Sequence, residues 1–250
     1  MSTRISIELV PRKLDKLTEE SQALSAQFPS LDTVNIPDLK RMSLRSWDAC
    51  SPLKAFFNSA IPHIRAWDFD IEGEAEALSN AVEPFDEVLV ITGDPDPKNP
   101  IERSPDHCLK TISKIRDKFP GKRVFAGLDP YRSGMQDEFK YVKEKIDAGA
   151  CGLFSQPFFS IDLLRAYRDL LPEDIDIFWG VSPVMSEKSK AYWIDVNRAL
   201  FPRDFEFSVE GNQRLAREIL AEVRKNEDSI YFMPIRMDAN EYLGGILSHG

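Results

Sequence analysis

Short apolar segments rich in β-branched and aromatic residues alternate with longer amphipathic segments along the chain. Short apolar runs of this kind are typical of buried strands. The pattern predicts eight strands, at 5–10, 33–36, 61–65, 87–92, 123–128, 152–155, 175–180 and 229–233.

Between these runs, hydrophobic residues recur every three or four positions, which predicts helices. The clearest helical segments are 14–27, 105–119, 136–148, 161–171 and 213–225, and the Ala- and Glu-rich segment 72–81 is expected to be helical as well. Asp106 and Ser160 are placed to cap helix N-termini, and Gly149 to end a helix.

Eight alternating strands and helical segments fit in one domain, residues 1–250, because no Gly/Ser-rich linker or repeat of 20–50 residues divides the chain. This order predicts an α/β fold, a single (β/α)8 TIM barrel; a doubly wound open sheet is the main alternative. In a barrel the active site lies at the carboxyl ends of the strands, so the residues there carry the functional prediction.

Hydrophobic residues make up 42% of the chain, enough for a sizeable core. With 32 Lys and Arg against 41 Asp and Glu, the net charge of −9 argues against a nucleic-acid partner. The three cysteines and three histidines are widely spaced and form no CxxC, so neither a disulfide framework nor a metal site is expected. Without a long apolar stretch we expect no signal peptide and no membrane partner, and the cysteine usage favours a cytoplasmic location.

Three strand ends carry charged candidates. Glu8 interrupts an apolar strand, and burial would raise its pKa and suit it to general acid catalysis. Asp94 follows Gly93 at the fourth strand and could accept a hydrogen bond from a ligand, although an Asp-Pro turn also explains it. Arg132 follows the fifth strand, either as a phosphate ligand or as an exposed turn residue.

Other candidates are polar or aromatic. The amide of Gln156 can grip the edge of a heterocycle, and Phe158 and Phe159 offer stacking surfaces, although at least one of them is expected in the core. His63 ends the third strand as a ligand contact or a structural hydrogen bonder. The basic stretch 40–45 either attracts an anion or is a solvated loop.

Taken in order, these strand ends resemble the methylenetetrahydrofolate reductase family. The matching pieces span essentially the whole chain: Ile7-Glu8-Leu9-Val10-Pro11, Pro62-His63, Gly93-Asp94, Asp147-Ala148-Gly149-Ala150, Ser155-Gln156-Pro157-Phe158-Phe159, Gly180-Val181-Ser182-Pro183-Val184 and Ile230-Tyr231-Phe232-Met233. The most specific is Asp-Ala-Gly-Ala followed by Gln-Pro-Phe-Phe.

The resemblance implies a barrel that binds flavin adenine dinucleotide (FAD) and reduces 5,10-methylenetetrahydrofolate to 5-methyltetrahydrofolate with NADH or NADPH. It implies that Glu8 is the general acid that protonates the substrate nitrogen and that Asp94 lies between flavin and pterin. The cofactor positions it implies are Asn35, His63, Thr92, Gly93, Asp94, Leu128, Arg132 and Lys145, and the substrate positions are Gln156, Phe158, Trp193 and Arg236.

The chain departs from the family pattern at several of these positions. Thr92 replaces an arginine before Gly-Asp, Glu144 a basic residue beside Lys145, and Ser189 a substrate glutamine. The strand-eight arginine of the family falls one residue from Arg236, and the segment 128–132 replaces a Tyr-Pro-Glu-x-His loop.

Two alternatives stay open after these departures. The first is a flavin-free enzyme that takes hydride directly from NAD(P)H. The second is a non-enzymatic folate- or corrinoid-pathway partner that acts with electron carriers. The sequence also leaves open a homo-oligomer or an electron-transfer partner.

Overall fold

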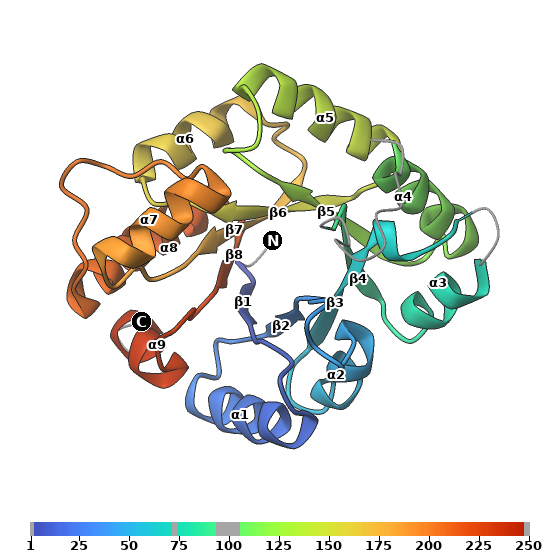
Figure 1. The fold of residues 1–250 in the computed structure, drawn as a ribbon, viewed down its shortest axis with the longest axis horizontal. Coiled ribbons are helices and arrows are strands. Elements are labelled where there is room, and N and C mark those ends of the chain that lie inside the picture. The colour runs from blue at the N-terminus through green and yellow to red at the C-terminus, as the bar shows by residue number, and fades with distance from the viewer. Residues whose placement is uncertain (1–2, 72–74, 94–105, 248–250) are drawn as a thin grey trace.

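The chain folds into a closed parallel barrel in which each strand pairs with its neighbours in sequence order, and β8 pairs with β1 (Figure 1). The computed structural model describes residues 3–71, 75–93 and 106–247. Its strands are β1 (Ile5–Glu8), β2 (Thr33–Ile36), β3 (Ser59–Arg65), β4 (Glu87–Ile91), β5 (Arg123–Leu128), β6 (Gly152–Pro157), β7 (Asp176–Val181) and β8 (Ser229–Phe232). The single (β/α)8 barrel is therefore confirmed, and the doubly wound sheet is wrong.

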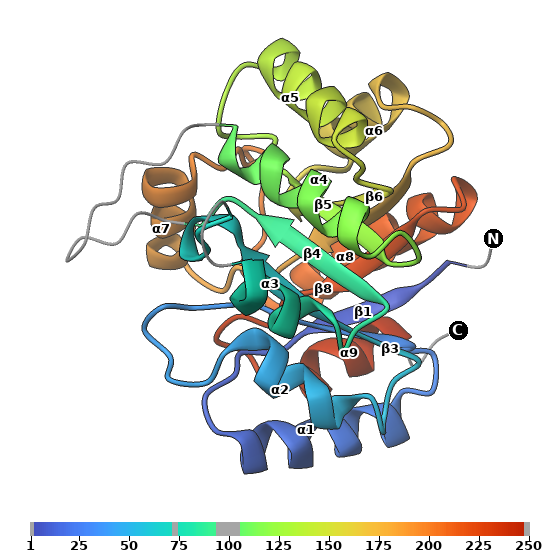
Figure 2. The same ribbon diagram turned by 90° about the vertical axis from the view of Figure 1, so that its right-hand side faces the viewer.

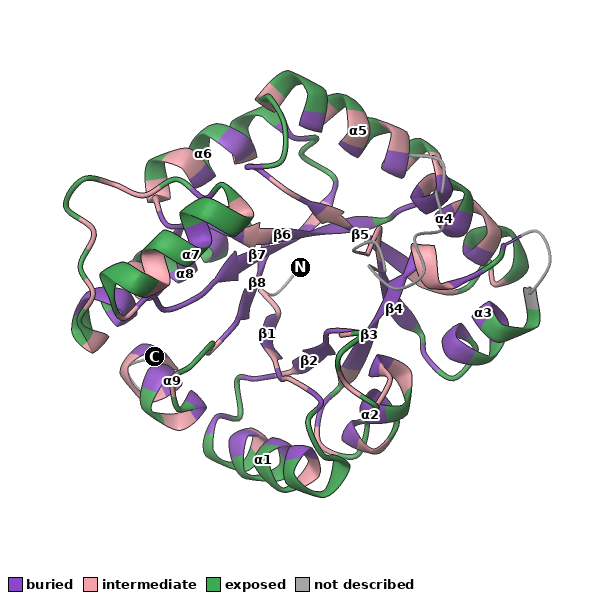
Figure 3. Cartoon of the chain, viewed as in Figure 1, coloured by how far each residue is buried: buried purple, intermediate pink, exposed green. Residues whose placement is uncertain are grey.

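Helices surround the strands as an outer ring, with their buried residues towards the strands and their exposed residues on the outside (Figure 3). They are α1 (Leu14–Gln27), α2 (Ser46–Leu53), α3 (Ala75–Val82), α4 (His107–Lys118), α5 (Met135–Asp147), α6 (Ile161–Leu170), α7 (Glu187–Asn197), α8 (Val209–Lys225) and α9 (Ala239–Leu247), with a 3-10 turn η1 (Ala66–Asp68). Within the described ranges, no helix is long and apolar enough to cross a membrane.

The predicted helix ends hold at two of three positions. The Ser160 hydroxyl accepts from the backbone N–H of Leu163 and caps α6. Gly149 has φ +115° after α5, a left-handed conformation that favours glycine, and Ala150 N–H closes the end by donating to Lys145 O at 3.0 Å. The cap predicted at Asp106 is wrong: its backbone is helical and its carboxylate pairs with Lys110 at 3.0 Å.

Large aromatic side chains fill the inside of the barrel. The rings of Phe154 and Phe178 stack with centroids 4.3 Å apart, and Phe125 meets both edge-on. A second, larger core lies between the strands and the helices. Because aromatic rings occupy the middle of the barrel, space for a ligand is left only towards its ends.

A network of charges closes the amino-terminal end of the barrel. Glu87 accepts hydrogen bonds from Arg4 at 2.6 and 2.9 Å and from Arg123 at 2.7 Å. Arg123 also donates to Asp176 at 2.7 Å, so the network joins β4, β5 and β7 to the residue before β1. The opposite, carboxyl-terminal end is therefore the open one.

Candidate active site

The main cavity lies at the carboxyl ends of the strands and has a volume of about 520 Å³. Strands β1, β3, β4, β5, β6 and β8 all contribute to its wall, and Asn197 at the end of α7 reaches it as well. Figure 2 shows α7 at one end of the barrel, clear of the ring formed by the other helices. The volume and position are those of a small-molecule site in a barrel enzyme.

Glu8 ends β1 and presents its carboxyl group to this cavity. Its side chain is 14% exposed, and Oε2 accepts from Nδ2 of Asn35 at 3.0 Å. Burial raises the pKa of Glu8 to about 7, while the hydrogen bond from Asn35 opposes the rise. Near neutral pH a large fraction of Glu8 is therefore protonated and able to give up a proton.

Asn35 on β2 lies behind the cavity wall and contacts Ser6 and His63 as well as Glu8. It accepts from the hydroxyl of Ser6 at 2.7 Å, and its amide nitrogen lies 3.2 Å from Nε2 of His63. Burial lowers the pKa of His63 to about 3, so the ring is neutral and its Nε2 can accept a hydrogen bond from the Asn35 amide. Asn35 thus positions Glu8; its side chain, named as a cofactor contact, is fully buried behind the cavity wall.

Two cations and a carboxylate form the wall near β5. Lys145 on α5 donates to the carbonyl of Gly127 at 2.6 Å and lies 3.7 Å from Glu138, and Arg132 pairs with the other oxygen of Glu138. The ring of Tyr141 lies under Nζ at 4.0 Å. Burial lowers the pKa of Lys145 to about 8. Two cations thus share the buried carboxylate of Glu138, and Asp129 adds a second carboxylate to the same wall.

The wall near β4 depends on a glycine. Gly93 has φ +85°, and a Cβ there would lie 3.1 Å from Nε of Arg65. Arg65 lines the cavity and pairs with Asp68 at 3.4 Å, and Thr92 and Leu128, named as cofactor positions, line it too. The sequence analysis includes Arg65 only as the end of the predicted strand 61–65. Its position as the last residue of β3 was the available signal, because strand ends form the mouth.

The basic stretch 40–45 is tied down by acids. Arg45 pairs with Asp38 and with Asp68, at 2.8 Å to the latter, and Lys40 lies 3.6 Å from Asp68. Lys40 and Arg45 are therefore held in ion pairs at the β2 and β3 ends of the barrel.

Gln156, named as a substrate position, is half-buried and lines the cavity from β6. Tyr231 on β8 lines the same space, and its hydroxyl donates to the carbonyl of Ser155, which ties β8 to β6 above the aromatic core. The cavity therefore has an apolar base and an amide and a carboxyl group on its wall.

Two predicted substrate contacts lie elsewhere. Phe158 is fully buried in the core, with its ring 5.2 Å from that of Trp179. Trp193 packs against Phe159 at 5.2 Å in an aromatic cluster beneath α7. Neither Phe158 nor Trp193 lines the main cavity. After Pro157 the chain leaves β6 and enters α6, and the rings of Phe158 and Phe159 are buried in the protein interior.

Arg236 belongs to a second hollow, the side cavity, of about 370 Å³ between the end of β1, α1 and the segment after β8. Glu8 and Met233 line both cavities, so the two adjoin at the acid. Arg236 has φ 59°, a left-handed conformation that costs a non-glycine residue about 1–3 kcal/mol. Asp94, predicted beside the flavin, lies outside the described residues.

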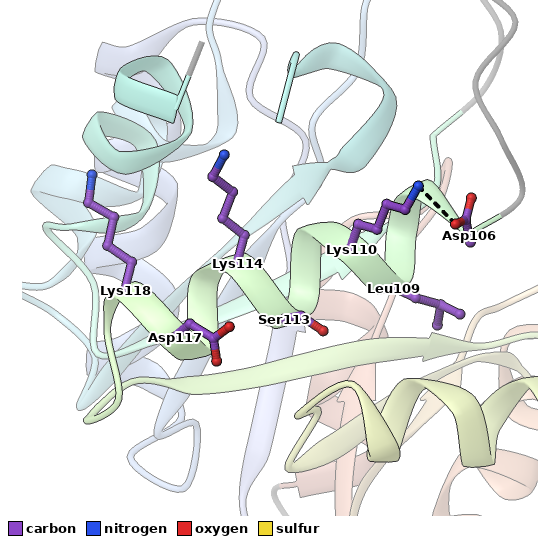
Figure 4. A pocket seen from close by; sticks show the side chains of 7 residues that line it. All are labelled: Asp106, Leu109, Lys110, Ser113, Lys114, Asp117 and Lys118. Atoms are coloured by element: carbon purple, nitrogen blue, oxygen red, sulfur yellow. Dashed lines mark ion pairs between the residues drawn. The ribbon is translucent and has the colours of Figure 1, made fainter. Parts of the chain in front are cut away.

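A further hollow on the outside of α4 is not an active-site candidate (Figure 4). Lys110 pairs with Asp106, Lys114 donates to the carbonyl of Ile71, and Lys118 donates to the hydroxyl of Ser79. These lysines attach α4 to the neighbouring segments, and no strand end reaches the hollow.

Comparisons with known proteins agree with this geometry. A solved structure of oxaloacetate acetylhydrolase, in complex with the inhibitor 3,3-difluorooxalacetate, superposes with a TM-score of 0.59 at 9% identity, covering 93% of this chain and 75% of that chain. At this identity the likeness concerns the fold alone. No curated protein sequence matches the chain.

A family model gives the sharper result. The model described as methylenetetrahydrofolate reductase matches residues 43–221, which is most of the chain and includes β3 to β7. The cavity built at the ends of those strands is therefore formed largely by the matched segment. On this match the chain belongs to the methylenetetrahydrofolate reductase family.

Proposed function

We propose that the protein reduces 5,10-methylenetetrahydrofolate to 5-methyltetrahydrofolate, with NADH or NADPH as electron donor and FAD as cofactor. Family membership supports reductase-like folate chemistry. The observation that carries the proposal is Glu8: a carboxyl group with a pKa of about 7, held by Asn35 at the mouth of the barrel.

Glu8 supplies the proton that opens the substrate. Protonation of the bridging nitrogen breaks its bond to the methylene carbon and leaves an iminium ion, which is the acceptor of hydride. The proton comes from the Glu8 carboxyl group, and the carboxylate that remains is stabilised by the hydrogen bond from Asn35. Proton transfer from a positioned acid with a pKa near the working pH contributes about 10²–10⁴ in rate.

Gln156 and the apolar base orient the pterin. The amide donates and accepts at once, which suits the mixed donor and acceptor edge of a pterin ring. Tyr231 and Phe154 close the cavity from below and exclude water from the reacting carbon. Exclusion of water protects an iminium ion from hydrolysis.

The residues present fit a flavin dinucleotide. Arg132 and Lys145 keep N–H groups beyond those bound to Glu138 and Gly127, and these can hold a pyrophosphate. Gly93 leaves room for close approach beside Arg65, a space that a Cβ would fill. When bound, the flavin would pass hydride from the nicotinamide to the substrate.

The test is a visible absorption spectrum of the purified protein. A flavin band that NADH or NADPH bleaches and methylenetetrahydrofolate restores is the expected result, and it names the donor. A flavin band that neither nucleotide bleaches would overturn NAD(P)H as donor and favour an electron-transfer partner.

A flavin-free reductase is the second candidate. It is favoured by Glu138, which already engages both Arg132 and Lys145, and by Thr92 in place of a cation. If flavin-free protein oxidises NADH at a rate that added FAD does not change, the flavin-dependent reductase is ruled out in favour of the flavin-free one.

A further inference from the structure

Helix α7 and the residues that follow it expose an unusual number of hydrophobic side chains. Of the seven large hydrophobic residues that are exposed in the described parts of the chain, four lie between positions 192 and 200. They are Tyr192 (55% exposed), Ile194 (43%), Val196 (61%) and Leu200 (60%). Hydrophobic residues exposed singly are normal, whereas a group of them marks a surface that binds another molecule.

α7 has a packed side and an uncovered side. On the packed side, Trp193 is 6% exposed and lies in the aromatic cluster beneath the helix. Two of the exposed hydrophobic residues, Tyr192 and Val196, share the other side with Lys188 and Asp195. The spacing of these four residues, i, i+4, i+7 and i+8, places them on one face of the helix, and all four are exposed. We call Lys188, Tyr192, Asp195 and Val196 the α7 face.

The packed side holds α7 firmly in place. The rings of Trp193 and Phe159 lie 5.2 Å apart, edge to face. At the carboxyl end of the helix, Nη1 of Arg198 donates to the carbonyl of Arg132 at 3.2 Å and joins α7 to the segment after β5. A surface carried by an anchored helix loses little conformational entropy when it binds a partner. The α7 face is therefore preorganised for contact.

The charges of the α7 face are placed against the dipole of their own helix. Lys188 is the second residue of α7, near its positive end, and Asp195 is the third from last, near its negative end. Among the described residues, neither side chain makes a hydrogen bond or ion pair. Within one copy of the chain, both charges are thus unfavourably placed and unpaired.

A second copy in the antiparallel orientation corrects both placements. Lys188 and Asp195 lie about 10 Å apart along the helix, on either side of Tyr192. Two α7 helices related by a two-fold axis near Tyr192 bring Lys188 of each copy against Asp195 of the other. Each charge then also lies near the helix end of opposite sign in the other copy. A partner that carried charge of one sign would match only one of the two.

We propose that the α7 face joins two copies of the chain in a symmetric dimer. The Tyr192 rings and the Val196 side chains meet at its centre, and the two Lys188–Asp195 pairs flank them, as an interface of identical patches requires. The proposal does not depend on the proposed folate chemistry, because no residue of the α7 face lines the main cavity.

Sedimentation equilibrium of the full chain at about 1–100 µM tests the dimer. A face built on one helix of 11 residues is smaller than the roughly 800 Å² per partner of a standard interface. We therefore expect a reversible dimer with a dissociation constant of about 1–100 µM. A chain that stays monomeric throughout this range overturns the proposal.

Charge reversal tests which face is used. Lys188→Asp and Asp195→Lys each set like charges against one another at both ends of the interface, and each should raise the dissociation constant at least about 10-fold. The double variant Lys188→Asp/Asp195→Lys restores both pairs and should bring the constant back to within about 3-fold of wild type. Both substitutions suit the dipole of α7, so a weaker dimer is not caused by a weaker helix.

The matched control is Lys143→Asp on α5. It makes the same change in charge at an exposed position outside the α7 face, where Lys143 pairs with Asp147 at 2.7 Å, and should leave the dissociation constant unchanged. A dimer that neither single reversal weakens uses another face and overturns the proposal. Weakening by both single reversals without recovery in the double variant overturns the antiparallel pairing.

Discussion

The proposed chemistry depends on the Glu8 carboxyl, which among the described residues is the one acid that lines both cavities. We predict that Glu8→Gln lowers kcat for methylenetetrahydrofolate reduction by about 10²–10⁴. The amide keeps the size of the acid and can still accept from Asn35, but it has no proton to give. Stopped-flow measurement of the reductive and the folate half-reactions separately should locate the loss in the folate step alone. An equal loss in both would contradict the acid role.

The raised pKa of Glu8 also makes the free energy of unfolding depend on pH. The native pKa of about 7 exceeds the ordinary value of 4.5, so between these pH values the unfolded chain releases a proton that the native protein keeps. The stabilisation is complete below pH 4.5 and is lost as pH rises through 7. We predict that the free energy of unfolding falls by up to about 3 kcal/mol across this window, and that the fall is absent in Glu8→Gln.

Urea unfolding of both proteins at several pH values measures this difference. The comparison with the variant is needed because His63 acts in the opposite direction. Its pKa is lowered by burial to about 3, so its contribution is present above its ordinary value of 6.5 and is lost as pH falls. Parallel curves for wild type and variant would show that Glu8 has an ordinary pKa.

The sequence predicted which residues line the cavity where this follows from their position along a strand. Glu8, His63, Gln156 and Arg132 line the main cavity because they lie in the carboxyl-terminal halves of strands or in the segments that follow them. A sequence does not show which way a ring turns: Phe158 and Trp193, named as substrate contacts, lie in buried clusters. Nor does a sequence show the buried position of Asn35, which depends on contacts across three strands.

At the scale of elements, α9 shows how two adjacent glycines differ. A Cβ on Gly245 would lie 2.1 Å from Cδ of Gln213, whose amide donates to the carbonyl of Glu241 at 2.9 Å. We predict that Gly245→Ala displaces Gln213 and destabilises the protein by about 1–3 kcal/mol. Gly244 has nothing within 4 Å, so Gly244→Ala should stabilise by about 0.5–1 kcal/mol through helix propensity.

Thermal or urea unfolding of the two variants measures the pair under identical conditions. Because the residues are neighbours in one helix, propensity favours alanine equally at both positions. A stabilising effect at both would show that α8 and α9 do not approach as closely as described.

The strands and amphipathic helices were predictable, and three helices were not. All eight strands lie where the apolar runs placed them, with ends shifted by at most two residues. Helix α9 was missed because it contains two glycines, α2 because it contains Pro52, and α7 because Tyr192, Ile194 and Val196 are all exposed, so its hydrophobic residues mark no buried face. Tertiary contacts, not local pattern, hold these three in place.

At the scale of the whole molecule, the barrel is closed at its amino-terminal end by ions and filled by aromatic rings, which leaves the carboxyl end for chemistry. This division separates stability from function. The apolar and aromatic interior could be anticipated from the strand pattern. The ionic closure could not, since Arg4, Glu87 and Arg123 are distant in sequence and meet only when the barrel closes.

Glu87 is the centre of that closure and gives the last prediction. An amide there would leave Arg4 and Arg123 facing each other without a shared negative charge, and would leave one side-chain oxygen to accept from the two arginines and Ser59. We predict that Glu87→Gln lowers the free energy of unfolding by about 2–4 kcal/mol near neutral pH, towards the lower end because Arg123 is 42% exposed. Burial alone would raise the pKa of Glu87, but the hydrogen bonds from Arg4 and Ser59 and the two positive charges outweigh it and lower the pKa.

The sign of the pH dependence follows from that lowered pKa. The contribution of Glu87 is present above its ordinary value of 4.5 and is lost as pH falls, so the gap between wild type and variant should narrow in acid. Urea unfolding near neutral pH and at acidic pH tests this. Glu173→Gln, which removes an exposed carboxylate between α6 and β7, is the control and should change stability little.

Because Glu87 lies at the end of the barrel remote from Glu8, folded Glu87→Gln protein should keep the wild-type pH profile of folate reduction. A shifted profile would mean that the floor of the barrel also sets the pKa of the acid at its mouth.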